Sequence, residues 1–150
     1  DDKVNSMTIS WGMVGIEWGK PIFVTFIREN RFTRSLIEKT GEFTVSIPID
    51  DSAKKILGFC GSKSGRDIDK AKEIGLTYEE PEMTSVPGVK ELPLTLECKV
   101  VYKQTQDTEA MTEENREKFY PQNVESSFSG ANRDTHIAYY GEIVDAYVIE

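Results

Sequence analysis

The sequence predicts a mainly β domain, an antiparallel barrel with short helices at its flanks. Stretches in which apolar residues alternate with polar ones recur along the chain and lie at both of its ends. Glycine and proline residues separate these stretches, as expected for strands joined by turns. Strands do not alternate with long helices, so a parallel sheet is not expected. About five strands and a few short helices therefore account for the pattern.

The first expected strand spans residues 5–12, which read Asn-Ser-Met-Thr-Ile-Ser-Trp-Gly. Met7, Ile9 and Trp11 share one face, and small hydroxyl residues occupy the other. A flat ligand could lie against such an edge and accept hydrogen bonds from its N–H and hydroxyl groups. A half-buried strand with a polar outer face explains the same pattern without a ligand. The glycines from Gly12 to Gly19 indicate a loop after this strand.

Four further segments have strand patterns. Pro21–Ile27 is a dense run of β-forming residues, and Glu42–Ile47 alternates until a proline ends it. Leu94–Gln104 is the longest alternating stretch, and its apolar residues at every second position are expected to share one face. His136–Ile149 closes the chain as a strand with a kink or bulge near Gly141.

Short helices are expected between the strands. Asn30 or Thr33 would cap a helix that continues through Ser35–Thr40 and stops at Gly41. The other expected helices are Ala53–Cys60 behind an Asp-Asp-Ser cap, a small helix from Asp67 or Ile68 to Gly75, and Glu113–Phe119. The last of these lies in the polar stretch 106–132, which is long enough to be a functional or partner-binding excursion.

Composition limits the class of protein. The chain has 150 residues, enough for one domain with a real core, and a formal net charge of -8. This charge argues against a general nucleic-acid or anionic-membrane binder, so a bound anion needs a local basic cluster. Cys60 and Cys98 form neither a disulfide framework nor a metal-binding spacing, and a reducing cytoplasm is expected. No apolar run is long enough to span a bilayer. Because the chain does not begin with Met, further residues are expected upstream of Asp1.

Two basic clusters stand out against this acidic background. One contains Arg28, Arg31 and Arg34 at the mouth of the first helix, and the other contains Lys63, Arg66 and Lys70 among Ser62, Ser64 and Gly65. A helix N-terminus with a nearby arginine and hydroxyl group suits a phosphate, and glycines let a loop close on a ligand. Solvated surface charge is the alternative interpretation of each cluster.

The sequence offers little acid–base or nucleophilic machinery. His136 is the only histidine and lies in a strand pattern, which favours a core-edge or solvent-facing side chain over a catalytic one. Cys60 could be a reactive thiol, but a small buried side chain explains its position as well. A site for a flat anionic ligand without such machinery indicates that a cofactor performs the chemistry.

The motifs also occur in a recognisable order. Asn5–Gly12 is followed by Arg31-Phe32-Thr33 ahead of Leu36-Ile37, then by Gly41-Glu42-Phe43, by Cys60-Gly61-Ser62-Lys63-Ser64-Gly65-Arg66-Asp67-Ile68-Asp69-Lys70 and by Gly141-Glu142-Ile143. Nearly the whole chain thus resembles the flavin reductase-like, FMN-binding split-barrel family, and within it the flavoredoxins. The resemblance implies a single domain over residues 1–150 with an antiparallel Greek-key split barrel. It also leads us to expect that the family's first N-terminal strand is missing here.

The resemblance further implies a homodimer that binds FMN close to the dimer interface. Met7 to Trp11 would line the isoalloxazine and ribityl chain, Arg31 and Thr33 would hold the phosphate, and the Ser62–Lys70 loop would complete the pocket. The implied cofactor-binding residues are Asn5, Met7, Thr8, Ile9, Ser10, Trp11, Arg31, Thr33, Cys60, Gly61, Lys63, Ser64, Gly65, Arg66 and Lys70. No metal ligand and no residue with a direct catalytic role is implied.

Three functions fit this site. The first is a flavin reductase-like oxidoreductase that passes hydride or electrons from NAD(P)H through FMN to an acceptor. The second is a flavoredoxin-type electron carrier with tightly bound FMN and a redox-protein partner. The third is a non-catalytic barrel that binds some other ligand. The sequence contains no feature that separates the first two.

Overall fold

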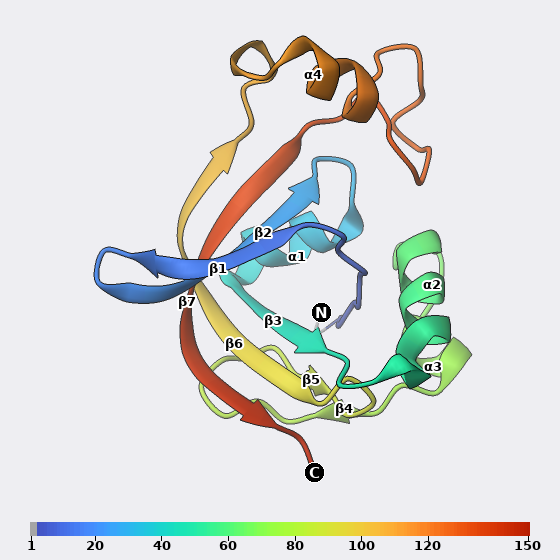
Figure 1. The fold of residues 1–150 in the computed structure, drawn as a ribbon. Coiled ribbons are helices and arrows are strands. Elements are labelled where there is room, and N and C mark those ends of the chain that lie inside the picture. The colour runs from blue at the N-terminus through green and yellow to red at the C-terminus, as the bar shows by residue number, and fades with distance from the viewer. Residues whose placement is uncertain (1–2) are drawn as a thin grey trace.

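The computed structural model describes residues 3–150 as a curved antiparallel sheet with four short helices. Five strands pair in the order β1-β2-β7-β6-β3, and β4 and β5 form a separate two-stranded ladder. Figure 1 shows the sheet curling beside α1, with α2 and α3 across from it and α4 beyond the ends of β6 and β7. The strands are β1 (Gly12–Glu17), β2 (Lys20–Arg28), β3 (Glu42–Ile47), β4 (Tyr78–Glu79), β5 (Gly88–Val89), β6 (Leu94–Thr105) and β7 (His136–Val148). The helices are α1 (Phe32–Thr40), α2 (Lys54–Ser62), α3 (Lys70–Ile74) and α4 (Glu113–Phe119), with 3₁₀ turns at Asp51–Ala53 and Thr108–Ala110.

The first strand lies later in the chain than predicted. The prediction of a strand over residues 5–12 was wrong, because residues 3–11 pair with no described strand and β1 begins only at Gly12. The predicted loop after it is instead a β1–β2 hairpin, turned by Trp18 and Gly19 with φ of 53° and 67°. Two successive positive φ values match the twist of a tight hairpin. An alternating pattern does not show whether a partner strand exists, and segment 5–11 instead makes side-chain hydrogen bonds with α1, α2 and α3.

The start of α1 also differs from the prediction. Arg31, not Asn30 or Thr33, occupies the N-cap position, and its side chain makes no capping bond. The amide of Asn30 instead donates to the carbonyl oxygen of Ser126 at 2.6 Å. The predicted stop is confirmed: Gly41 has a φ of 67°, and its N–H donates to the carbonyl of Ile37.

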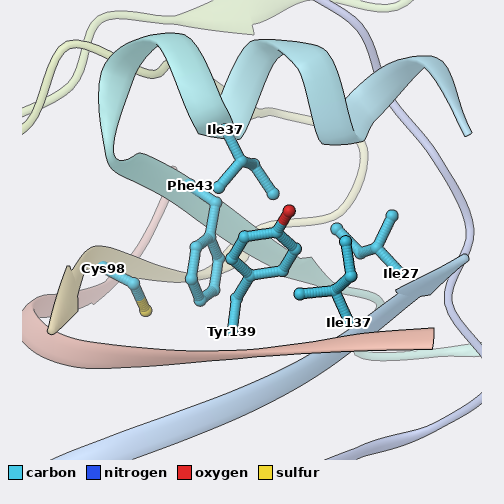
Figure 2. Close-up of a cluster of buried hydrophobic side chains, with 6 residues drawn as sticks. All are labelled: Ile27, Ile37, Phe43, Cys98, Ile137 and Tyr139. Atoms are coloured by element: carbon cyan, nitrogen blue, oxygen red, sulfur yellow. The ribbon is translucent and has the colours of Figure 1, made fainter. Parts of the chain in front are cut away.

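The main core lies between α1 and the sheet. Figure 2 shows Ile37 of α1 above side chains from four strands, namely Ile27, Phe43, Cys98, Ile137 and Tyr139. Gly141 permits this packing, because a Cβ there would lie 2.5 Å from the ring of Phe43. The pairing of β6 with β7 shifts register twice. Val101 is the extra residue on β6, opposite Gly141, and Val144 is the extra residue on β7, so the predicted bulge of the last strand lies three residues after Gly141.

Two adjacent residues of β6 are fully buried on opposite faces of the sheet. Cys98 lies in the core cluster, against which Leu96 and Val100 also pack, as the expected shared apolar face requires, and Glu97 is buried under the backbone of residues 82–84. The shared face ends at the register shift between Val100 and Tyr102, and Tyr102 is 42% exposed. Burial favours the neutral form of Glu97, but hydrogen bonds from Tyr147 and from the backbone of residues 82–84 outweigh it and lower its pKa to about 2. Glu97 thus fixes the connection between β4 and β5.

The described residues contain neither a membrane-spanning helix nor a cluster of metal ligands. None of the helices in residues 3–150 has the length and apolar character needed to cross a bilayer. Within the same residues, His, Cys, Asp and Glu side chains form no group that could hold a metal ion.

Candidate functional site

A cavity of about 800 Å³ opens between segment 5–11, the start of α1, the loop after α2 and the excursion 106–135. It gathers residues from across the chain. All fifteen residues that the sequence analysis named for cofactor binding line it: Asn5, Met7, Thr8, Ile9, Ser10, Trp11, Arg31, Thr33, Cys60, Gly61, Lys63, Ser64, Gly65, Arg66 and Lys70. The structure thus brings these residues together, and their role in holding FMN stays a prediction.

Segment 5–11 is held by hydrogen bonds to the helices around it. The amide of Asn5 donates to the hydroxyl of Thr33 at 2.9 Å, and the hydroxyl of Thr8 donates to the carbonyl of Leu57 at 2.6 Å. The ammonium of Lys70 donates to the carbonyl of Ser6 at 2.7 Å. These bonds explain how a segment outside the sheet keeps a defined path along the cavity. They also engage the Thr8 hydroxyl, which the strand interpretation had left for a ligand.

The cavity wall is strongly cationic for so acidic a protein. Its lining contains five cationic side chains and a single carboxylate, that of Asp67: the cations are Arg28, Arg31, Lys63, Arg66 and Lys70. A surplus of positive charge on a chain of net charge -8 favours an anionic ligand at this place.

Lys70 is the most unusual of these cations because it is only 4% exposed. Its ammonium donates to two backbone carbonyls, of Ser6 and of Cys60 at 2.9 Å, and no described carboxylate bonds to it. Burial lowers the pKa of Lys70 against an opposing influence from Cys60, and a weaker repulsion from Arg31 lowers it further. An anion in the cavity would supply the counter-charge that the protein does not.

The loop after α2 approaches segment 5–11 and α1 closely. A Cβ at Gly65 would lie 2.2 Å from the Asn5 Oδ1 atom and 2.9 Å from the Phe32 ring. Arg66 of the same loop donates to the carbonyl of Asn30 at 2.9 Å, just before Arg31. The two basic clusters of the sequence are therefore neighbours. Arg34 does not join them, since it lies outside the cavity lining and donates to the carbonyl of Glu29.

The excursion, here residues 106–135, closes the other end of the cavity, so the stretch that the sequence marked as a functional or partner-binding excursion contributes to the site. Arg28 is 7% exposed and donates to the carbonyls of Phe119, Asn132 and Asp134, so it anchors the excursion. Arg31 donates to the carbonyl of Ser129 at 3.0 Å. The residues that the excursion adds to the lining are Phe119, Ser127, Ser129, Gly130 and Ala131. No local sequence pattern marks them, because long-range bonds to Arg28 and Arg31 place them.

Aromatic rings gather at this end of the cavity. The ring centre of Trp11 lies 5.1 Å from that of Phe119, with the rings edge to face, and 4.9 Å from the ring centre of His136. His136 begins β7, is 8% exposed and lines the cavity. The sequence interpretation of a core-edge histidine therefore missed its place in the site. The cavity has one basic end and one aromatic end.

The two cysteines show no sign of an activated thiol. Both are free and buried, and Cys60 lines the cavity while Cys98 lies in the core. Burial raises the pKa of Cys60 against the opposing charge of Lys70, and burial raises that of Cys98 to about 12. Neither group forms a thiolate readily at neutral pH.

The comparisons with known proteins agree with this picture. The family profile described as flavin reductase like domain matches residues 1–150. The chain belongs to this family. An uncharacterised protein of Archaeoglobus fulgidus is 34% identical over 100 residues, which are 67% of this chain and 55% of that relative. The chain thus spans about half the length of the curated relatives it matches.

Solved structures share the fold. A flavoredoxin of Methanosarcina acetivorans is 25% identical with a TM-score of 0.67, and the match covers 97% of this chain and 62% of that one. The flavoredoxin of Desulfovibrio vulgaris has a TM-score of 0.70 at 24% identity and the same coverage. The predicted mainly β, antiparallel split barrel with short flanking helices is thereby confirmed.

Proposed function

We propose that the cavity binds FMN, and that the protein is a flavin reductase-like oxidoreductase. The observation that carries the proposal is the surplus of positive charge around a cavity on an acidic protein. A phosphate monoester carries nearly two negative charges at neutral pH and accepts several hydrogen bonds. Arg31, Lys63 and Arg66, with the hydroxyls of Thr33 and Ser64, are the groups that would receive it.

The size and shape of the cavity fit the rest of such a ligand. A volume of about 800 Å³ lies within the range of small-molecule and cofactor sites. Gly61 and Gly65 keep the loop close to segment 5–11, where larger side chains would intrude. Met7, Ile9 and Trp11 offer apolar surface for a flat ring system. Bound FMN would supply hydride and single-electron transfer, and the residues around it would bind it, orient it and limit water.

The favoured activity is electron transfer from NAD(P)H through the flavin to an acceptor. The family described as flavin reductase like supports this proposal. A flavoredoxin-type carrier, reduced by a redox-protein partner, is the second candidate, and the flavoredoxin from Methanosarcina acetivorans supports it. A barrel that binds another ligand without catalysis is the third. The two free thiols are compatible with a reducing cytoplasm, which is part of the proposal.

We also propose a homodimer formed through the β1–β2 hairpin and the sheet face beside it. Six large apolar side chains there are 42–77% exposed, and we call them the hairpin patch: Met13, Val14, Ile16, Trp18, Val101 and Tyr102. Each partner of a standard interface buries roughly 800 Å², and these six side chains would form the apolar centre of such a surface. The charged residues at the hairpin turn, Glu17 and Lys20, are opposite in sign and face each other in register, so pairing two copies there adds little repulsion despite their net charge.

Anaerobic stopped-flow reduction distinguishes the three functions. The FMN-loaded protein is mixed with NADH or NADPH, and the flavin absorbance is followed. Fast bleaching by either nucleotide supports the reductase. Slow bleaching by both, with rapid reduction by a ferredoxin-like donor, supports the carrier. A protein that binds no added FMN supports the third function and contradicts the proposal.

A further inference from the structure

A chain of hydrogen bonds lies behind the aromatic end of the cavity. The hydroxyl of Tyr120 donates to the Gln106 Oε1 atom at 2.6 Å and lies 2.7 Å from the His136 Nδ1 atom. A tyrosine hydroxyl has one proton, and the Tyr120 hydroxyl uses it in the hydrogen bond to Gln106. The Tyr120 oxygen can therefore only accept from His136, so Nδ1 carries the imidazole proton.

Several contacts hold this chain in place. Tyr120 is 4% exposed, and the guanidinium of Arg28 lies 5.0 Å from the centre of its ring. The backbone N–H of Gln106 donates to the carbonyl of His136 at 3.0 Å. Both partners of the histidine thus belong to the excursion, and Arg28 fixes the excursion to β2.

The second ring nitrogen of His136 opens into the cavity. Nε2 has no hydrogen-bond partner among residues 3–150. Every fully buried side-chain nitrogen or oxygen in that part of the chain does have a partner, so Nε2 is not fully buried. Nε2 is therefore accessible, and the cavity is the space that His136 lines. The ring centre of Trp11 lies 4.9 Å from that of His136, and Phe119 packs edge to face against Trp11 at the same end of the cavity.

The ring is also held neutral. Burial, followed by the charges of Arg28 and Arg31, lowers the pKa of His136 to about 4. Tyr120 is the other titratable group on the ring, and burial raises its pKa despite Arg28. A neutral imidazole protonated at Nδ1 has a lone pair at Nε2, so it accepts hydrogen bonds there and does not donate them.

We propose that Tyr120 and Gln106 are positioning residues that fix His136 as the Nδ1-protonated imidazole, so that the aromatic end selects ring compounds with an N–H or O–H donor. Such a compound would be the second substrate beside the flavin, and this identification alone rests on the proposed function. The tautomer and the preference for donors are properties of the protein without flavin.

Nitrogen NMR of the flavin-free protein tests the tautomer. His136 is the only histidine, so the ring gives a single pair of ¹⁵N resonances. We expect a protonated, pyrrole-type signal at Nδ1 and an unprotonated, pyridine-type signal at Nε2 at neutral pH. The opposite assignment in the wild-type protein overturns the proposal without the need for any variant.

Variants then test the two positioning residues. Tyr120→Phe removes the acceptor for Nδ1–H, and Gln106→Leu frees the Tyr120 hydroxyl to donate to Nδ1, so both are expected to move the proton to Nε2. Gln106→Glu keeps an acceptor for Tyr120 and should retain the wild-type pattern. Tyr102→Phe is the matched control, because that hydroxyl bonds to Gln104 on the exposed part of β6. An unchanged pattern in Tyr120→Phe or in Gln106→Leu overturns the role of that residue.

Phenol and anisole test the preference for donors, because anisole carries an O–CH3 group in place of the O–H donor of phenol. Phenol is expected to shift the Nε2 resonance and to bind about three- to tenfold more tightly, the range for one hydrogen bond. Equal binding of the two probes contradicts the proposal. Because flavin is absent from both experiments, a failure of FMN binding would leave these results intact, and the reverse also holds.

Discussion

Replacing Arg31 with alanine should weaken binding of FMN far more than binding of riboflavin. The two ligands share the ring system and ribityl chain, and FMN alone carries the phosphate. The Arg31 guanidinium has five N–H donors and donates one hydrogen bond, to the Ser129 carbonyl. The others are available to a phosphate. One charge-assisted hydrogen bond contributes about 1.5–3 kcal/mol, which corresponds to an increase of about 10- to 150-fold in the Kd for FMN.

Loss of the Ser129 contact affects both ligands alike, so it cancels in the ratio of their affinities. Fluorescence titration of each flavin against wild type and Arg31→Ala gives that ratio directly. Arg34→Ala is the matched control, because Arg34 is three residues away but lies outside the cavity lining. An equal loss for FMN and riboflavin, or an equal effect of Arg34→Ala, would refute the phosphate role.

Three further predictions concern the loop, the buried carboxylate and the hairpin patch. Gly65→Ala should displace Asn5 and raise the Kd for FMN, whereas Gly58→Ala, where a Cβ meets nothing within 4 Å, should leave it unchanged in the same titration. Glu97→Gln should destabilise the fold by about 1–3 kcal/mol at neutral pH in urea unfolding. Because the folded pKa of Glu97 is about 2, below its usual 4.5, its stabilisation is present above pH 4.5 and is lost as pH falls towards 2, and the variant should lack this dependence. Ile16→Glu should yield a monomer in light scattering, while Ile49→Glu, at another exposed isoleucine outside the patch, should not; a dimer in both variants would exclude the hairpin patch.

Local sequence patterns predicted much of the fold, because glycine and proline residues mark the ends of many helices and strands. Glu42–Ile47 and Glu113–Phe119 appear with the predicted bounds, and Gly41 ends its helix as expected. Segment 5–11 alternates like a strand but lies outside the sheet. The prediction failed there because alternation shows which face is apolar and does not show whether a partner strand exists. Trp18 supplied no turn signal, because tryptophan rarely adopts a positive φ.

The basic end of the site was predictable, and the aromatic end was predictable only at Trp11. Positively charged residues stand out on an acidic chain, so both basic clusters could be identified from the sequence, and the family resemblance then placed Arg31 and the Ser62–Lys70 loop around one ligand. The place of Phe119 depends on Arg28, whose side chain reaches carbonyls about a hundred residues away in the sequence, and the place of His136 in the site depends on the pairing of β7 with β2. Such bonds leave no periodic trace in the sequence.

The most direct test of the central claim is a crystal structure of this chain grown with FMN. We predict that the phosphate lies within hydrogen-bonding distance of the Arg31 guanidinium and of the Ser62–Lys70 loop, with the ring system along Met7 to Trp11. Flavin bound at another surface, or a phosphate that contacts neither basic group, would contradict the account.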